Sequence, residues 1–274
     1  MLGILAMMKR AFQTSFMITI VLFGVSCESA TESKIRHIQG IAQGAGLGAQ
    51  ALASFSASLK AKPERFFELL DKILAQAEAD PWLLVRADKA RAIPADYEPK
   101  DLVSLDGTSV VVSRPGHRVR LPAYQALAAA AAAAKAEGVT LLVSSAYRSY
   151  AYQESLFARN VAELGRQEAE RVSARPGTSQ HQLGTAVDFG SITDAFAGTA
   201  AGRWMGANAG RFGFSLSYPQ GYEALTGYVW ESWHYRYIGI EASAMQNEYF
   251  GGLQYNLLLF LDAYRATIAV TPKK

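Results

Sequence analysis

The sequence SQHQLGTAVDF, residues 179–189, places a histidine seven residues before an aspartate in a chain with only four histidines. His181 and Asp188 are both residue types that bind divalent metal ions. A hydrolytic zinc site typically uses three protein ligands and leaves a fourth position for water. Gly184 and Ala186 are small, which lets the backbone pass close to a metal ion and leaves room for a substrate. The stretch therefore predicts two ligands of a metal site.

The third ligand has to come from the other histidines. His37 lies in the N-terminal part of the chain, where we expect it to be exposed, and His117 follows an Arg-Pro-Gly turn. His234 lies in WESWHYRY, among aromatic residues near the end of the predicted domain. By context, His234 is the best candidate for the third ligand.

Glu231 lies three residues before His234. A carboxylate beside a metal-bound water can take its proton and later pass it to a leaving amine. In a regular strand, however, residues three apart point to opposite faces. Glu231 and His234 can therefore share a site only if the chain bends at Ser232 or Trp233.

The surrounding sequence predicts helices interspersed with a few short strands. Pro63 suits the first turn of a helix, and Gly138 suits a helix end. We expect helices over residues 63–79, 123–137, 150–170, 204–211 and 254–266, and strands over 108–113, 139–145 and 228–237. Because few strands look parallel, the pattern favours the α+β class, with a small antiparallel sheet flanked by helices.

Several motifs in the same order resemble the VanY-type D-alanyl-D-alanine carboxypeptidases, zinc peptidases that share their fold with the hedgehog signalling domain. The resemblance spans about residues 80–240, inside an expected domain of residues 63–266. Its motifs are SSAYRSYAYQ (144–153), S-x-H-x-x-G-x-A-x-D (179–188), NAGRFGFSLSYP (208–219) and GYVWESWHYRYIG (227–239), which contains E-x-W-H. Agreement of several spaced motifs is more specific than any one of them.

The resemblance implies a role for each matched residue. His181, Asp188 and His234 would bind zinc, and Glu231 would act as general base and acid. Arg148 would hold the substrate's carboxylate or carbonyl oxygen and stabilise the developing oxyanion, a task suited to a forked cation. The remaining expected substrate contacts are Gln153, Ser179, Trp233 and Tyr218.

Three positions depart from the family pattern without removing a ligand or the base. Gln180 stands where the family often has Glu, and Tyr235 replaces a common Trp. Ser232 replaces a common Pro before the Trp-His pair, at the bend that Glu231 needs. The departure at Ser232 therefore concerns catalysis more than metal binding.

These roles imply a carboxypeptidase that removes a terminal D-alanine from the stem peptides of bacterial peptidoglycan. The alternatives are an L,D-carboxypeptidase or a peptidoglycan endopeptidase of the same fold, and a non-catalytic peptidoglycan-binding lipoprotein that retains the zinc site. The net charge is +3, from 27 basic and 24 acidic residues, which is too balanced to favour a nucleic-acid partner. We expect a monomer.

The first 27 residues predict an export signal. Lys9 and Arg10 precede a ten-residue apolar stretch, residues 16–25, which suits the core of a signal peptide and is short for a membrane span. A start at Met8 would give a more ordinary export signal than the apolar residues before it. We therefore expect a protein of the cell envelope.

Cys27 is the only cysteine and directly follows that apolar stretch. Its position resembles the lipobox of bacterial lipoproteins, in which the cysteine is lipidated, although Gly24 stands where a larger aliphatic residue is usual. The alternative is an ordinary cleaved signal that contains a cysteine. Lipidation of Cys27 would anchor the protein to a membrane.

Residues 28–62 are rich in Gly, Ala and Ser. This composition predicts a tether or loosely structured lead-in, which would let the domain reach away from a lipid surface. The alternative is a weak helix that packs on the domain.

Overall fold

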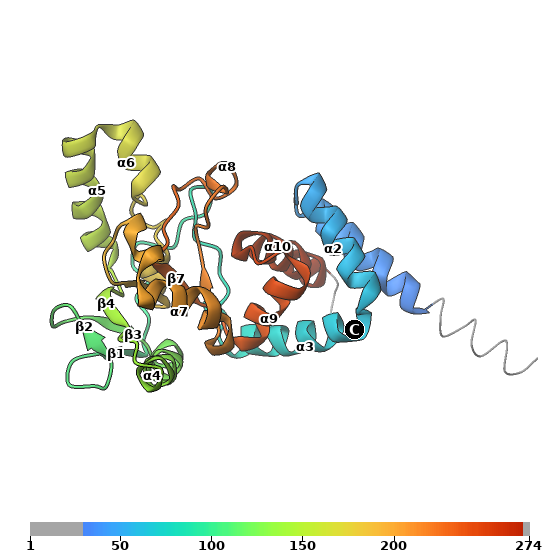
Figure 1. Ribbon diagram of the computed structural model, residues 1–274. Helices are drawn as coiled ribbons and strands as arrows, with labels where there is room; N and C mark the ends of the chain where they lie inside the picture. The colour runs from blue at the N-terminus through green and yellow to red at the C-terminus, as the bar shows by residue number, and fades with distance from the viewer. Residues whose placement is uncertain (1–29, 271–274) are drawn as a thin grey trace, which may run out of the picture.

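The computed structural model describes residues 30–270, so the expected signal segment and Cys27 lie outside the described residues. Figure 1 shows a helical end containing α2, α3, α9 and α10, and a mixed end that contains the sheets. The main sheet has the strand order β2-β4-β5-β7-β6. Its strands are β2 Val111–Val112, β4 Leu142–Ser145, β5 Ala186–Phe189, β7 His234–Tyr237 and β6 Phe214–Leu216.

The pairing of the strands agrees with the α+β class. β4, β5, β7 and β6 pair antiparallel in that order, whereas β2 pairs parallel with β4, so the expected antiparallel sheet has one exception. A second, two-stranded sheet joins β1 Leu102–Ser104 to β3 Arg118–Arg120. The register places Asp188 opposite both Ser145 of β4 and His234 of β7. The sheet thereby brings two of the predicted ligands to neighbouring positions.

Helix α4, Leu121–Ala136, confirms the helix expected from the alanine-rich segment. Pro122 lies in its first turn, where the missing amide hydrogen is not needed. Leu127, Ala130 and Ala134 are buried in one hydrophobic core together with Val143 of the main sheet. The small alanine side chains let this helix lie close to the strands.

The helix expected over residues 150–170 is two helices. α5, Tyr150–Leu164, ends at Gly165, which has a φ of 76°, and α6, Arg166–Val172, follows. Glycine adopts a positive φ readily because it has no Cβ. The chain therefore turns at Gly165 where the apolar pattern alone predicts one continuous helix.

The helical end has its own core. α3, Pro63–Ala79, has the bounds predicted from the sequence, and it packs with α9, Ile240–Tyr249. α9 in turn packs with α10, Gln254–Val270, whose Phe260 contacts Phe66 of α3. One face of α3 is buried, and it consists of Phe66, Leu69, Leu70 and Ile73. Burial of a side chain of this size contributes about 1.5–3 kcal/mol to folding.

The expected tether is wrong for the described part of residues 28–62. Residues 30–44 are helical, and α2, Ala49–Ala61, follows after a short turn. Ile38, Phe55 and Leu59 are buried in the core of the helical end. Large apolar side chains spaced among the small residues cause this packing, which is the helical alternative stated above.

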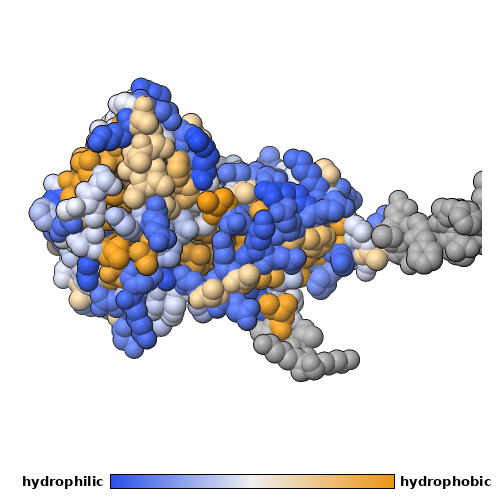
Figure 2. Space-filling model, turned by 90° about the horizontal axis from the view of Figure 1, so that it is seen from below, coloured by the Kyte–Doolittle hydropathy of each residue, from blue (hydrophilic) through white to orange (hydrophobic). Residues whose placement is uncertain are grey.

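The remaining elements connect the strands. The helix expected over 204–211 is α7, Ala200–Asn208, continued by a 3₁₀ turn, and the strand expected over 228–237 is regular only in β7. The other short elements are η1 Gln180–Leu183, η2 Asp194–Gly198, η3 Ala209–Phe212 and α8 Glu223–Thr226. Between residues 30 and 270 no helix is long and apolar enough to cross a membrane. On the face in Figure 2, hydrophobic residues are interspersed among hydrophilic ones.

Candidate metal centre

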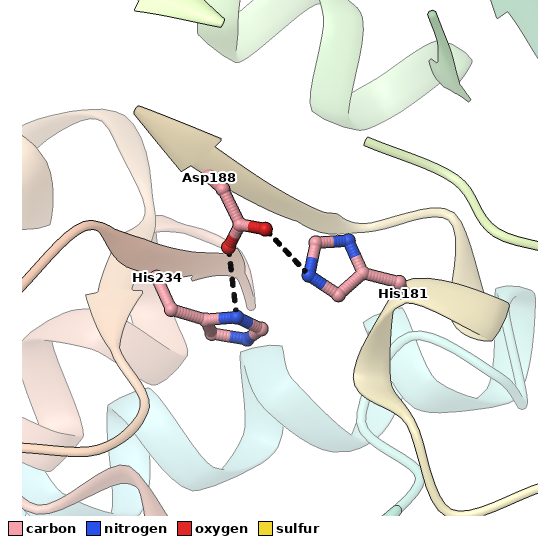
Figure 3. Close-up of side chains that lie close together, drawn as sticks. All are labelled: His181, Asp188 and His234. Atoms are coloured by element: carbon pink, nitrogen blue, oxygen red, sulfur yellow. Dashed lines mark ion pairs between the residues drawn. The ribbon is translucent and has the colours of Figure 1, made fainter. Parts of the chain in front are cut away.

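The three predicted ligands converge in the structure (Figure 3). His181 Nε2 lies 3.2 Å from Asp188 Oδ2, and His234 Nδ1 lies 3.0 Å from Asp188 Oδ1. One ligand atom from each residue lies within 4.8 Å of the other two, and all three side chains are buried. The donor set of two imidazoles and one carboxylate suits a divalent metal ion.

Different elements position the three ligands. Asp188 and His234 are register partners on β5 and β7, and His181 lies on η1, which ends at Gly184. Gly184 has a φ of 70°, and a Cβ there would lie 2.8 Å from Cγ of Arg120. The glycine is therefore required by the turn and by packing against β3, which corrects the expectation that it makes room at the metal.

Second contacts orient the two imidazoles. His181 Nδ1 lies 2.6 Å from the carbonyl oxygen of Ala146, and His234 Nε2 lies 3.2 Å from Oε1 of Gln180. Both partners are oxygens that accept, so each of these ring nitrogens is the donor. The opposite nitrogens, His181 Nε2 and His234 Nδ1, are then left with lone pairs that face Asp188. Such outer contacts commonly fix the tautomer of metal-binding histidines.

The buried atoms at the centre fit a metal ion. Among the described residues, His181 Nε2 and Asp188 Oδ1 are buried without a hydrogen-bond partner. Leaving buried polar atoms unsatisfied costs free energy, which a bound cation would remove. Burial, with Arg148 adding to it, lowers the pKa of His181 to about 4, so its imidazole is neutral and able to bind metal.

Glu231 lies beside the centre because the chain bends where the sequence required it. Ser232 and Trp233 form a turn, and the His234 amide donates to the Glu231 carbonyl oxygen at 3.3 Å. The turn brings Glu231 Oε2 to 3.4 Å from His234 Nδ1. Burial raises the pKa of Glu231 to about 7, although the nearby His234 lowers it. The expected bend is therefore present without the proline that the family often has.

Arg148 lies at the edge of the same centre. Its Nη2 is 3.4 Å from Asp188 Oδ2, and its Nη1 donates to Gln153 Oε1 at 3.2 Å. Gln153 is buried on α5, and its Nε2 donates to the carbonyl oxygen of Ala174 at 2.8 Å. Gln153 thus holds the guanidinium of Arg148 as well as lining the cleft.

One cleft, with a volume of about 320 Å³, contains all the predicted catalytic, substrate-binding and metal-binding residues. Its lining includes Arg148, Gln153, Ser179, His181, Asp188, Tyr218, Glu231, Trp233 and His234. The ring of Tyr218 is buried, and its centroid is 4.9 Å from that of His234. The Ser179 hydroxyl accepts from the His181 amide at 3.3 Å, so Ser179 caps η1 besides lining the cleft. His37 is exposed and His117 lies outside this cleft.

Several lining residues of the cleft were not predicted from the sequence, and two of them contact predicted site residues. Gln180 contacts His234 directly, yet in the sequence it is only a departure from a family pattern. Tyr228 lines the cleft, and its ring centroid is 4.8 Å from that of Tyr218. The position of Gln180 next to His181 is the only sequence feature that could have indicated its role.

Comparisons with known proteins agree with this geometry. The family model for VanY, described as D-alanyl-D-alanine carboxypeptidase, matches residues 116–240. A D-alanyl-D-alanine carboxypeptidase of Enterococcus faecalis is 36% identical over 177 residues, which cover 61% of this chain and 63% of that protein. The chain spans a little under two thirds of two of the curated relatives that it matches, and 33% and 55% of two others.

Two solved structures are similar over most of their length. The LD-carboxypeptidase LdcB is 34% identical with a TM-score of 0.60, and the match covers 66% of this chain and 86% of that one. A mutant of the vancomycin-resistance D,D-pentapeptidase VanY, solved with Zn(II), is 33% identical with a TM-score of 0.55. That match covers 65% of this chain and 99% of the other. Since the VanY structure is 33% identical and almost completely covered, and the His-Asp-His centre with neighbouring Glu231 is present, the chain belongs to the VanY-type D-alanyl-D-alanine carboxypeptidase family.

Proposed function

We propose that this protein is a zinc-dependent carboxypeptidase that removes the terminal D-alanine from peptidoglycan stem peptides. The observation that carries the proposal is the position of Glu231 Oε2, 3.4 Å from a ligand atom of a buried His-Asp-His set. A metal site that only stabilises the fold is usually closed by a fourth protein ligand. Here a carboxylate and an arginine flank three ligands within one cleft.

His181 Nε2, His234 Nδ1 and a carboxylate oxygen of Asp188 would hold the zinc ion, as the Zn(II) complex of the VanY structure supports. When bound, zinc supplies Lewis acidity, which polarises a peptide carbonyl and lowers the pKa of a water. Glu231 accepts the proton of the attacking water and delivers it to the departing amine. Burial raises the pKa of Glu231 above its ordinary value, and a base whose pKa approaches the working pH can both gain and lose a proton.

Arg148 provides positive charge where the substrate reacts. Its side chain is 19% exposed, and its guanidinium is held by Gln153 and reaches towards Asp188 at the metal centre. A cation fixed in this way can bind the terminal carboxylate or stabilise negative charge on the carbonyl oxygen. It does so without reorganisation during the reaction, because Gln153 is itself buried.

A second candidate activity is L,D-carboxypeptidase, which the similarity to LdcB favours. Both activities use the same ligands, base and arginine, and they differ in the stereochemistry of the residue before the cleaved bond.

We also propose that the protein is exported, lipidated at Cys27 and monomeric in the cell envelope. The apolar stretch of residues 16–25 and the position of Cys27 support this location.

The test uses the purified chain and two peptides, one ending in D-Ala-D-Ala and the other one residue shorter. Release of D-alanine from the longer peptide, abolished by a chelator and restored by zinc, is the expected result. Preference for the shorter peptide would instead establish the L,D activity. If neither peptide is cleaved by a chain that binds zinc, both carboxypeptidase activities are excluded.

A further inference from the structure

A second groove opens from the catalytic cleft and has no role in the chemistry above. It has a volume of about 290 Å³ and lies between the turn from β2 to β3 and the loop from β4 to α5. These segments lie at the end of the molecule away from the helical end (Figure 1). The groove shares Arg114, Ser145, Arg148 and Tyr152 with the catalytic cleft. An extended ligand bound in the catalytic cleft can therefore continue into this groove.

The groove is lined by positive charge. Its charged lining residues are Arg114, Arg118 and Arg148, and no acidic side chain is among them. His117 also lines it, but burial and the charge of Arg114 lower the pKa of His117, so this ring is neutral at pH 7. Three acidic residues lie nearby, Glu98, Asp106 and Asp188, and none of them lines the groove. Asp188 lies 3.4 Å from Arg148, so the positive charge free for a ligand is that of Arg114 and Arg118.

Arg114 and Arg118 remain available to bind a ligand in spite of these nearby acids. Arg114 is exposed, and across residues 30–270 its side chain makes no ion pair or hydrogen bond. Arg118 lies 3.6 Å from Glu98, but both side chains are about half exposed, and such pairs are weak. The Asp106 carboxylate accepts from the Gly116 amide, so it braces the turn that carries both arginines.

The geometry also limits how freely Arg118 moves. Its guanidinium lies 5.2 Å from the ring centroid of Tyr147, a cation–π distance. The Tyr147 amide in turn donates to the Arg118 carbonyl oxygen at 2.9 Å. The turn and the loop are thus joined to each other, and the arginine is partly ordered before any ligand binds. Guanidinium groups arranged in this way suit a carboxylate, which they can bind with paired hydrogen bonds.

We propose that this groove binds a free carboxylate of the substrate peptide, on the amino-terminal side of the cleaved bond. The inference rests on the proposed function and specifies its substrate. The terminal residue is a single amino acid, and the cleft interior around Arg148 and Gln153 would hold it. The rest of the bound peptide would then extend along one wall of the cleft. Arg114 marks the wall that continues into a groove, whereas Arg159, also exposed in the cleft lining, does not line that groove.

The experiment compares two pentapeptides that end in D-Ala-D-Ala. They differ only in the residue three positions before the terminal alanine, which carries either a free carboxylate or a carboxamide. We expect the zinc-loaded full chain to cleave the free acid with a kcat/KM roughly fivefold higher, the size of one exposed ion pair. Raising the salt concentration should reduce this preference, because exposed charges are screened.

Three variants test whether the groove is responsible for this preference. Arg114→Gln should lower kcat/KM for the free acid far more than for the carboxamide peptide, so that the preference between the two is lost. Arg159→Gln tests a lining arginine of the cleft that lies outside the groove, and Arg36→Gln is a control on the N-terminal helix, with a side chain that is 68% exposed. Both should keep the wild-type preference. Equal melting temperatures and zinc contents would show that the variants are folded.

Equal cleavage of the two peptides by the wild-type chain would overturn the carboxylate subsite and leave the proposed function standing. Loss of the preference in Arg159→Gln but not in Arg114→Gln would also overturn it, by placing the carboxylate near Arg159 instead of in the groove. Cleavage of neither peptide would contradict the proposed function itself, and the subsite with it.

Discussion

Gln180 shows how one uncharged side chain can determine the geometry of a metal ligand. Its Oε1 accepts from His234 Nε2 and also from the hydroxyl of Ser217, at 2.7 Å. Its Nε2 donates to Gln254 Oε1 at 3.2 Å. Because all of these groups are buried, the amide has few other orientations. The imidazole of His234 is thereby held with Nδ1 towards Asp188.

Replacing Gln180 should weaken zinc binding more than it affects folding. We expect Gln180→Ala to reduce zinc affinity about 10- to 100-fold, as for other outer partners of metal-binding histidines. Gln180→Glu, the matched control, keeps an acceptor for His234 and should keep the affinity near the wild-type value. A competition titration with a chromophoric chelator measures both constants. Equal affinities for the alanine and wild-type proteins would refute this role.

At the scale of single elements, the turn after η1 sets the position of His181 relative to β5. Gly184 ends η1 in a left-handed conformation and packs against Arg120, Leu102 and Pro99. Arg120 itself is fixed by ion pairs with Asp80 and Asp101, so it has little freedom to move away. A side chain at residue 184 would therefore strain both the backbone and its neighbours.

Gly184→Ala should lower the free energy of unfolding by about 2–4 kcal/mol, combining a positive φ with a contact too close for a Cβ. Gly138→Ala is the matched control. Its φ of 75° is similar, but nothing lies within 4 Å of its Cβ position, so only the backbone cost of about 1 kcal/mol applies. Urea denaturation of the two variants measures the difference. Similar losses would show that crowding at Gly184 has no effect.

Several elements could be predicted from the sequence because their causes are local. The apolar spacing of Phe66, Leu70 and Ile73 predicts α3, and the turn at Ser232 follows from the need to bring Glu231 beside His234. The pairing of Asp188 with His234 across β5 and β7 depends instead on strand register, which only the resemblance could supply. The break at Gly165 depends on a backbone conformation that an apolar pattern does not indicate.

At the scale of the whole molecule, the N-terminal helices belong to the folded domain. The ring of Phe55 on α2 packs against Phe66, Phe250 and Phe260, with ring centroids 5.0–5.7 Å apart. The composition of residues 28–62, rich in Gly, Ala and Ser, did not predict these contacts, because they are made by the few large apolar residues in the segment. If Cys27 is lipidated, the catalytic domain would lie closer to the membrane than the distance it could reach on a flexible tether of residues 28–62.

Phe55→Ala should therefore destabilise the whole protein. We expect a loss of about 3–5 kcal/mol in the free energy of unfolding, because the ring is fully buried and its removal leaves a cavity. Ser54→Ala, at an exposed position of the same helix, should change stability by less than about 0.5 kcal/mol. Differential scanning calorimetry measures both variants. A Phe55→Ala protein as stable as the wild type would show that α2 does not contribute to the fold.

The central claim is that Glu231 transfers protons at a zinc ion held by His181, Asp188 and His234. The most direct measurement is the rate of D-alanine release by Glu231→Gln, with its zinc content determined on the same sample. The glutamine keeps the shape of the side chain but cannot accept the proton. We predict full zinc occupancy with kcat reduced by about 10²–10⁴-fold. A zinc-loaded Glu231→Gln protein that retains wild-type activity would contradict the account.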